Sequence, residues 1–408
     1  MITTTLKNKT AFPLVTLTTA VVLALSVTGC QKFSKTAAIQ QPAPLIKLTS
    51  TQQVITPLLG QNGTHKLPKS LGFTAKKTAL SQQTTAFKTA FDDQGYVNAT
   101  ADGTVQALDP QGKPVWQIKL KQGLLSGISM DSQSRLVIVA DHKGVMLALD
   151  RRTGQTVWQT PLDTATLAPA LITKNRVIAL GNDGNVRALS LESGQPIWQF
   201  STQNPALSVR GSAMPVLLDD STVLVSTADG RVHALNTDDG VPLWSKRFGM
   251  SQGSSDIERL SDIDATPVVD SNMLYVITYS GQLVAADMAS KQLSFVKPFA
   301  SLKSVAVDAT QLYATTLQGD VIAMDKMTGN INWQTDALSY RGLSNPVSSG
   351  MHLIVGDALG YLHVFDKTNG TLVDRQSTPS DVALLQYSNQ RLIAQSSHGT
   401  FSVWQVNR

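Results

Sequence analysis

The sequence of 408 residues has little of what most catalytic and metal-binding sites are made from. Cys30 is the only cysteine, and Glu192 and Glu258 are the only glutamates. A single cysteine forms no disulfide within the chain, so packing and hydrogen bonds alone must hold the fold. No i,i+4 pair or Cys/His ligand spacing is present among the six histidines, which are His65, His142, His233, His352, His363 and His398. We therefore predict no metal site and no cofactor.

Charged residues are also few, at 15% of the chain, and the formal net charge is only +5. Two of these positive charges, Lys7 and Lys9, would leave with a signal peptide, which lowers the net charge to about +3. A protein that binds nucleic acid through its charge needs a far stronger positive balance. We therefore expect no nucleic-acid partner.

The one long uncharged stretch lies at the N-terminus, from Thr10 to Gly29 after Lys7 and Lys9. It ends in Val27-Thr28-Gly29-Cys30, which resembles a bacterial lipobox, so residues 1–29 are predicted to be a lipoprotein signal peptide and Cys30 the lipidated residue. The alternative is an uncleaved membrane anchor, for which the stretch is nearly long enough. Acyl chains on Cys30 would attach the protein to a membrane. By resemblance to lipoprotein sorting in enteric-type bacteria, Gln31 favours the outer membrane, with the protein on its periplasmic face.

An eightfold repeat dominates the rest of the chain. Glycines recur at intervals of 38 to 51 residues, at Gly103, Gly144, Gly184, Gly230, Gly281, Gly319, Gly360 and Gly399. This interval is the length of one four-stranded propeller blade. The spacing predicts an all-β fold over residues 64–408, an eight-bladed β-propeller with four-stranded antiparallel blades. Residues 30–63 show no sustained period and are predicted to be a flexible tether that follows the lipidated cysteine.

The fourth repeat shows the unit most clearly. Short apolar segments at 214–218, 222–227, 231–236 and 241–248 alternate with turns, of which Asp229-Gly230 supplies the positive φ of a tight hairpin. Four residues after each anchor glycine stands a small or β-branched residue, which lets blades approach closely: Ala107, Ala148, Ala188, Ala234, Ala285, Ala323, Val364 and Val403. Six residues after it stands a polar residue, and most of these can cap the next turn: Asp109, Asp150, Ser190, Asn236, Asp287, Asp325, Asp366 and Gln405.

A tryptophan follows the next turn in five repeats, as Gly-x-x-x-Trp. The pairs are Gly112 with Trp116, Gly154 with Trp158, Gly194 with Trp198, Gly240 with Trp244, and Gly329 with Trp333. Lys291 with Phe295, and Gly370 with Asp374, are degenerate copies. Tryptophans at repeat spacing more often pack between blades than against a cofactor, so we interpret them as hydrophobic ties.

The eighth repeat ends after a strand at 400–406 and lacks its outermost strand. A strand from the N-terminal side is therefore predicted to pair with the last blade, close the ring and remove its open edge. His65–Gly72 is the favoured donor, and Leu45–Thr51 is the alternative.

Three stretches resemble one family in particular: Leu207–Ala213, Ser255–Val269 and Val355–His363. Together with the lipobox and the repeat of glycine, small residue, aspartate and tryptophan, they resemble the BamB family of propeller lipoproteins, which serve the outer-membrane β-barrel assembly machinery. The resemblance implies a non-catalytic scaffold that docks on the periplasmic POTRA domains of the barrel subunit BamA. It implies that this scaffold assists folding and insertion of outer-membrane proteins, with unfolded outer-membrane proteins as a second class of partner.

The same resemblance implies a partner-binding surface on loops between blades. The matching positions are Leu207, Val209, Arg210, Asp262 and Asp264. Val209 departs from the leucine usual in the family, which reduces apolar contact. Apolar side chains beside an arginine and two carboxylates suit the centre of an interface. The alternative is that Asp262 and Asp264 form turns and that Arg210 pairs with them within the propeller.

Enzymatic alternatives find little support in the residues. A quinone-dependent dehydrogenase-like or carbohydrate-active periplasmic propeller would suit the fold, but the vicinal cysteine pair that often stacks on the quinone is absent. Residues 249–253 match the Gly-x-Ser-x-Gly elbow of hydrolases around Ser251, yet they follow an outer strand and run into a polar loop, where no elbow forms. We therefore predict no catalytic residue.

Overall fold

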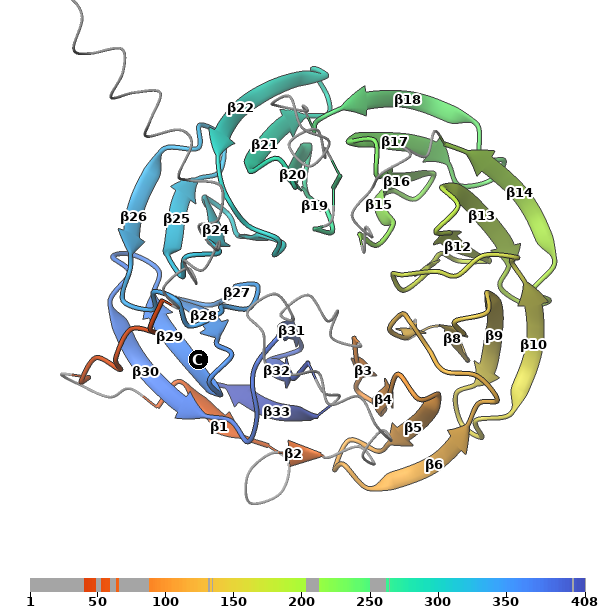
Figure 1. Ribbon diagram of the computed structural model, residues 1–408, viewed down its shortest axis with the longest axis horizontal. Helices are drawn as coiled ribbons and strands as arrows, with labels where there is room; N and C mark the ends of the chain where they lie inside the picture. Colours follow the sequence, from red (N-terminus) through yellow and green to blue (C-terminus); the bar gives the residue numbers. More distant parts are fainter. Residues whose placement is uncertain are drawn as a thin grey trace, which may run out of the picture. The chain divides into compact units, whose positions relative to one another are not determined.

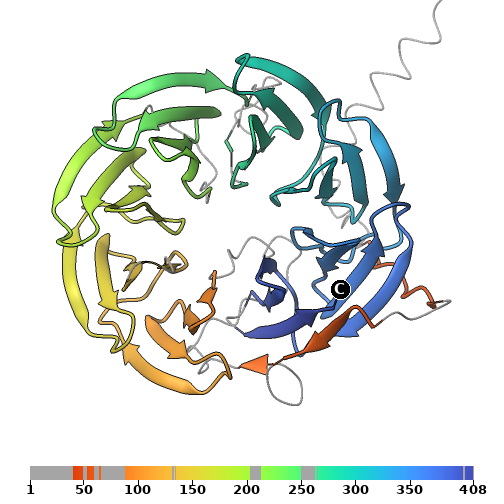
Figure 2. The ribbon, with the colours of Figure 1, turned by 180° about the vertical axis from the view of Figure 1, so that it is seen from behind.

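The computed structural model describes residues 40–48, 53–58, 64–65, 88–130, 133, 135–202, 213–249, 262–263, 265–397 and 400–407. The predicted signal peptide and Cys30 lie outside these residues. The chain divides into two units, Met1–Gln41 and Pro42–Arg408. The second unit contains eight antiparallel sheets that follow one another around a ring, seen from opposite sides in Figures 1 and 2. The predicted all-β, eight-bladed propeller is confirmed.

Each blade takes its strands in chain order from the centre of the ring outward. Blade 1 comprises β3 (Ala90–Asp92), β4 (Gly95–Ala99), β5 (Thr104–Leu108) and β6 (Pro114–Lys119), and blade 2 comprises β7 (Ser129–Met130), β8 (Leu136–Ala140), β9 (Val145–Asp150) and β10 (Thr156–Pro161). Blade 3 comprises β11 (Leu171–Ile172), β12 (Arg176–Leu180), β13 (Asn185–Ser190) and β14 (Pro196–Ser201), and blade 4 comprises β15 (Val216–Asp219), β16 (Thr222–Ser226), β17 (Arg231–Asn236) and β18 (Pro242–Arg247). Blade 5 comprises β19 (Val268–Asp270), β20 (Met273–Thr278), β21 (Gln282–Asp287) and β22 (Gln292–Pro298), and blade 6 comprises β23 (Ala306–Val307), β24 (Gln311–Thr315), β25 (Val321–Asp325) and β26 (Ile331–Thr335). Blade 7 comprises β27 (Val347–Ser349), β28 (His352–Gly356), β29 (Tyr361–Asp366) and β30 (Leu372–Ser377). Blade 8 comprises β31 (Leu384–Ser388), β32 (Arg391–Gln395) and β33 (Phe401–Val406), with β1 (Ile55–Pro57) and β2 (Thr64–His65) beside β33.

The turn chemistry is that expected from the sequence. Gly230 has φ +77° in the turn between β16 and β17, where Thr227 N donates to Arg231 O. Asp150 Oδ1 caps the turn after β9 by accepting from Thr153 N at 2.8 Å. Ala234, four residues after its glycine, is fully buried. The hydrophobic clusters join neighbouring blades, as in the cluster that contains Tyr275 and Phe295 of blade 5 with Met324 of blade 6. The core therefore lies between blades.

The predicted tryptophan ties are confirmed at four joints. Each indole Nε1 donates to a backbone carbonyl of the next blade: Trp116 to Arg151 O at 2.8 Å, Trp158 to Leu191 O at 2.9 Å, Trp198 to Thr237 O at 3.0 Å and Trp333 to Lys367 O at 2.7 Å. Each ring also covers a turn glycine of that blade. A Cβ added at Gly240 would lie 2.5 Å from the Trp198 ring, so the close approach requires glycine.

Blade 5 meets blade 6 without a tryptophan. Phe295 takes its place and covers Gly329, where an added Cβ would lie 2.8 Å from the ring. A phenylalanine has no donor, but Tyr275 Oη of β20, two strands nearer the centre of the ring, donates to Lys326 O at 3.0 Å. Lys326 occupies the position in its repeat that Thr237 occupies at the Trp198 joint. The same carbonyl is thus satisfied by a different residue.

Ring closure confirms the use of an N-terminal strand and corrects its position. β1 pairs with β33 in the register Ile55↔Val406 and Pro57↔Trp404, inside the segment 30–63 that we predicted to be a tether. From the favoured donor His65–Gly72, His65 alone is described in a strand, opposite Phe401, and residues 66–72 lie outside the described residues. In the alternative donor Leu45–Thr51, residues 45–48 are described and form no strand.

The signal missed was Asp374, the degenerate copy of the tryptophan in repeat 7. Its Oδ2 accepts from Val54 N at 2.9 Å and from Ile55 N at 3.2 Å. Asp374 is buried, as are both residues that it holds. The departure from tryptophan therefore marks the place where the closing strand attaches.

Within the described part of the chain, no helix has the length and apolarity needed to cross a membrane.

Candidate functional site

Two connections between neighbouring blades, 202–215 and 248–267, are longer than the others. Blade 3 ends with β14 at Ser201 and blade 4 begins with β15 at Val216, while blade 4 ends at Arg247 and blade 5 begins at Val268. The corresponding connections after blades 5 and 7 are residues 299–305 and 378–383 only. Long loops on a rigid scaffold are typical binding sites. They are also the loops that carry the predicted partner-binding residues.

The ends of these two loops are fixed next to each other. Met214 N, at the end of the first loop, donates to Thr266 Oγ1, at the end of the second, at 3.1 Å. Thr266 O in turn accepts from Ser304 Oγ of blade 6 at 3.0 Å. Ile263 is buried in the apolar cluster between blades 4 and 5. The loops therefore arise side by side from a firmly packed base.

Of the five predicted partner-binding residues, Asp262 alone is described. Leu207, Val209, Arg210 and Asp264 lie outside the described residues, as does Ser251. Asp262 is 1% exposed, and its carbonyl oxygen accepts from Tyr279 N of blade 5 at 2.8 Å. This position suits a residue that fixes the base of the loop, as in the alternative interpretation. The predicted surface as a whole stays a prediction.

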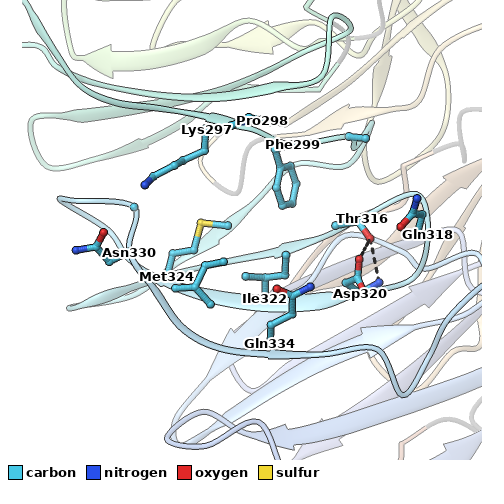
Figure 3. Close-up of a pocket in the computed structure, with 13 residues that line it drawn as sticks. Lys297, Pro298, Phe299, Thr316, Gln318, Asp320, Ile322, Met324, Asn330 and Gln334 are labelled. Atoms are coloured by element: carbon cyan, nitrogen blue, oxygen red, sulfur yellow. Dashed lines mark hydrogen bonds between the residues drawn. The ribbon is translucent and has the colours of Figure 1, made fainter.

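A pocket of about 590 Å³ lies between blades 5 and 6, beside the joint where Phe295 replaces the tryptophan (Figure 3). Phe299, Ile322 and Met324 give it an apolar wall. Its one carboxylate, Asp320, accepts from Thr316 Oγ1 at 2.8 Å. That hydrogen bond stabilises the turn between β24 and β25, so Asp320 has a structural partner. The pocket is therefore a groove at the blade joint, and its lining residues form no acid–base pair.

A second pocket, of about 610 Å³, opens among the inner strands β3, β7 and β11. Lys88 lies in its wall, with Nζ 3.7 Å from Met214 Sδ, and burial lowers the pKa of this lysine. Asp92 and Asp93 line the same pocket. The described residues contain no group of three or more His, Cys, Asp or Glu side chains arranged to hold a metal ion.

The two histidines on repeat strands have structural partners. His233 is buried, with Nε2 3.2 Å from Thr227 Oγ1 and Nδ1 2.6 Å from Ser245 Oγ. His363 is fully buried, with Nε2 2.9 Å from Asp357 Oδ2. Burial lowers the pKa of both rings. Both rings are therefore held by hydrogen bonds within their own blades.

Sequence reasoning missed the polar network around His363 in blade 7. Arg341 Nε donates to Asp357 Oδ2 at 2.6 Å, and Arg375 Nε donates to His363 Nδ1 at 3.3 Å. Burial alone would raise the pKa of Asp357, but hydrogen bonds from His363 and Arg341 hold it below its usual value. Asp357 and His363 lie in the stretch Val355–His363 that carries the family resemblance. Nothing in the sequence indicated the two arginines.

Comparison with known proteins identifies the family. The family model described as outer membrane protein assembly factor BamB matches residues 101–335. The outer membrane protein assembly factor BamB of Yersinia pestis is 28% identical over 398 residues, which cover 94% of this chain and 97% of that protein. The crystal structure of BamB from Moraxella catarrhalis is 38% identical, covers 78% of this chain and 96% of its own, and has a TM-score of 0.74.

Quinone enzymes share only the fold. The quinohemoprotein alcohol dehydrogenase of Comamonas testosteroni has a TM-score of 0.62 at 12% identity, covering 78% of this chain and 74% of that one. Similarity at this identity carries no activity with it. The family model and the relatives instead agree on one conclusion: the chain belongs to the BamB family of outer membrane protein assembly factors, which are not catalysts.

Proposed function

We propose that this protein is a lipid-anchored scaffold on the periplasmic face of the outer membrane, where it docks on the POTRA domains of BamA and assists the folding and insertion of outer-membrane proteins. In this proposal residues 1–29 are a signal peptide, Cys30 carries the acyl chains, and residues 64–408 with β1 form the propeller. Unfolded outer-membrane proteins are a second class of partner. Family membership supports the assembly role, and the lipobox supports the anchor.

The observation that carries the docking proposal is the pair of long connections after blades 3 and 4. The hydrogen bond from Met214 N to Thr266 Oγ1 holds their ends together. A loop that leaves a fixed base loses less conformational entropy when a partner orders it. Leu207 and Val209 supply apolar contact, and Arg210 and Asp264 supply charges that set the register.

Capture by the isolated POTRA domains of BamA tests this proposal. Arg210→Ala and Asp264→Ala should weaken capture of the full chain by tenfold or more, roughly what a central interface charge contributes. Lys174→Ala is the matched control, because this lysine is 87% exposed and belongs to the turn between β11 and β12, not to either long connection. Circular dichroism verifies that each variant is folded. Equal capture of all three variants contradicts the assigned surface.

A further inference from the structure

The chain before β1 is bound to blade 7 and to the connection that leads into it, well ahead of the closing strand. Ala43 N donates to Ser339 O at 2.8 Å, and Arg341 Nη1 donates to Ala43 O at 2.9 Å. Three residues further on, Arg375 Nη1 donates to Ile46 O at 2.9 Å. Both arginines donate to backbone carbonyls of the N-terminal segment. The attachment therefore depends on the backbone path of this segment more than on the identity of its side chains. We call Arg341 and Arg375 the arginine clamp.

The arginine clamp is rigid because its far side is anchored in the blade. Arg341 is 4% exposed and Asp357, its ion-pair partner, is fully buried. The guanidinium also lies over the Tyr361 ring, with its centre 5.5 Å away. Arg375 is held through His363, which is itself fixed by Asp357. A buried ion pair is costly unless its remaining donors are used, and Ala43 O uses one of them.

The arginine clamp shortens the length of chain between the predicted lipid and the first attachment to the propeller. If β1 were that attachment, the 23 residues 31–53 would reach at most about 80 Å when fully extended. With the attachment at Ala43, the 12 residues 31–42 reach at most about 40 Å. The next attachment, Asp374 with Val54 and Ile55, lies in the same blade.

We infer that the arginine clamp fixes how the propeller faces the lipid bilayer: blade 7 is held next to the membrane surface, and the blades across the ring point into the periplasm. Blade 3, which ends with β14, lies opposite blade 7 (Figure 1). The base of the first docking loop follows β14, so this orientation leaves it open to a partner in the periplasm. This inference rests on the proposed lipidation of Cys30 but not on the proposed docking residues.

Energy transfer to the bilayer tests the inference. The full lipidated chain is placed in vesicles of phosphatidylethanolamine and phosphatidylglycerol that contain an acceptor-labelled lipid. A donor dye is attached either at Met351→Cys in blade 7 or at Lys174→Cys in blade 3, two exposed residues in equivalent turns before the second strand of their blades. With Cys30 acylated, the introduced cysteine is the one free thiol. We expect transfer from position 351 to be at least about twofold stronger, given the short reach of the free chain.

Two insertions separate a clamped chain from a free one. About ten Gly/Ser residues inserted between Gln41 and Pro42 lengthen the free part by up to about 35 Å and should remove the difference between the two dyes. The same insertion between Leu48 and Thr49, after the arginine clamp, should leave the difference unchanged. Neither insertion lies within a strand of the described residues.

Equal effects of the two insertions overturn the inference, as does equal transfer from both dyes in the parent chain. Arg341→Ala and Arg375→Ala, combined with the second insertion, should behave like the first insertion, because Ala43 and Ile46 both lose the guanidinium donors that hold them. Flotation with the vesicles and the mass of the N-terminal peptide report on lipidation separately. A peptide without acyl chains overturns the anchor and this inference together, whereas weak capture by BamA leaves both intact.

Discussion

The joint between blades 3 and 4 and the joint between blades 7 and 8 occupy equivalent places in the repeat but use opposite chemistry. At the first, Trp198 covers Gly240 and donates to Thr237 O. At the second, Asp374 stands in the tryptophan's place and accepts from two backbone amides of the N-terminal segment. The first joint links consecutive parts of the chain, and the second must also capture a distant one. Asp374, which departs from the repeat, therefore has a structural role that the tryptophans at the other joints do not have: it binds the N-terminal strand.

The largest effect is expected at the second joint. Asp374→Ala leaves Val54 N and Ile55 N buried without their acceptor, which should lower the free energy of unfolding by about 2–5 kcal/mol. Urea denaturation of the two proteins measures the loss. Asp374→Asn keeps one acceptor oxygen and should recover part of it. An alanine variant as stable as the parent would show that the closing strand holds without this carboxylate.

The tight contact at the first joint should be the next most sensitive. Gly240→Ala puts a methyl group 2.5 Å from the Trp198 ring at φ +73°, with an expected cost of about 2–4 kcal/mol. Gly281→Ala is the matched control, because its φ is +81° and nothing lies within 4 Å of the added Cβ. The control should lose about 1 kcal/mol, from backbone strain alone. Similar losses for the two variants would remove the tryptophan contact from the explanation.

Two buried histidines, in blades 4 and 7, differ in their response to pH. His363 of blade 7 is faced by Asp357, Arg341, Arg375 and Tyr361, and its Nδ1 accepts from Arg375. His233, beside the first joint, lies between two hydroxyl groups. When the ring is protonated, both hydroxyl oxygens can rotate to accept hydrogen bonds from its two N–H groups. Burial lowers both folded-state pKa values below the unfolded value of about 6.5. Below pH 6.5 the unfolded chain therefore binds more protons, and stability falls by up to about 1.4 kcal/mol per pH unit and histidine.

Urea denaturation at pH 7.5 and at pH 5.5 measures this fall. His363→Gln should remove more of the pH dependence than His233→Gln, because Arg375 cannot become an acceptor. Equal pH dependence in the two variants would contradict the role given to Arg375.

The smallest effect concerns the third kind of joint, between blades 5 and 6. Tyr275→Phe removes the donor to Lys326 O and should cost about 1 kcal/mol. Burial raises the pKa of Tyr275, so its hydroxyl stays protonated and able to donate. Trp198→Phe removes the equivalent bond at the first joint and also indole contact area, so it should cost more. A Tyr275→Phe variant without any loss would mean that water satisfies this carbonyl.

The repeat made the fold predictable, because the hairpin glycine and the polar capping residue recur in every blade and the tryptophan in five. The outer strand of the last blade was predicted to come from the N-terminal side, but β1 was misplaced because Ile55–Pro57 has only three residues and no alternating pattern. Asp374 was seen as a degenerate copy and not as an acceptor, since its donors lie 319 and 320 residues away. The partner-binding residues could be predicted only from the family resemblance, because segments outside the repeat have no sequence period to interpret.

Ring closure has a consequence for the order in which the molecule matures. β1 emerges among the first segments of the chain, and its partner β33 is the last strand to be made. A contact across so long a separation forms late and slowly. Until it forms, the last blade exposes an unpaired edge that invites proteolysis and aggregation. A chain truncated before β33 cannot pair this edge with β1. Closure of the ring therefore protects complete chains and leaves truncated ones open to degradation.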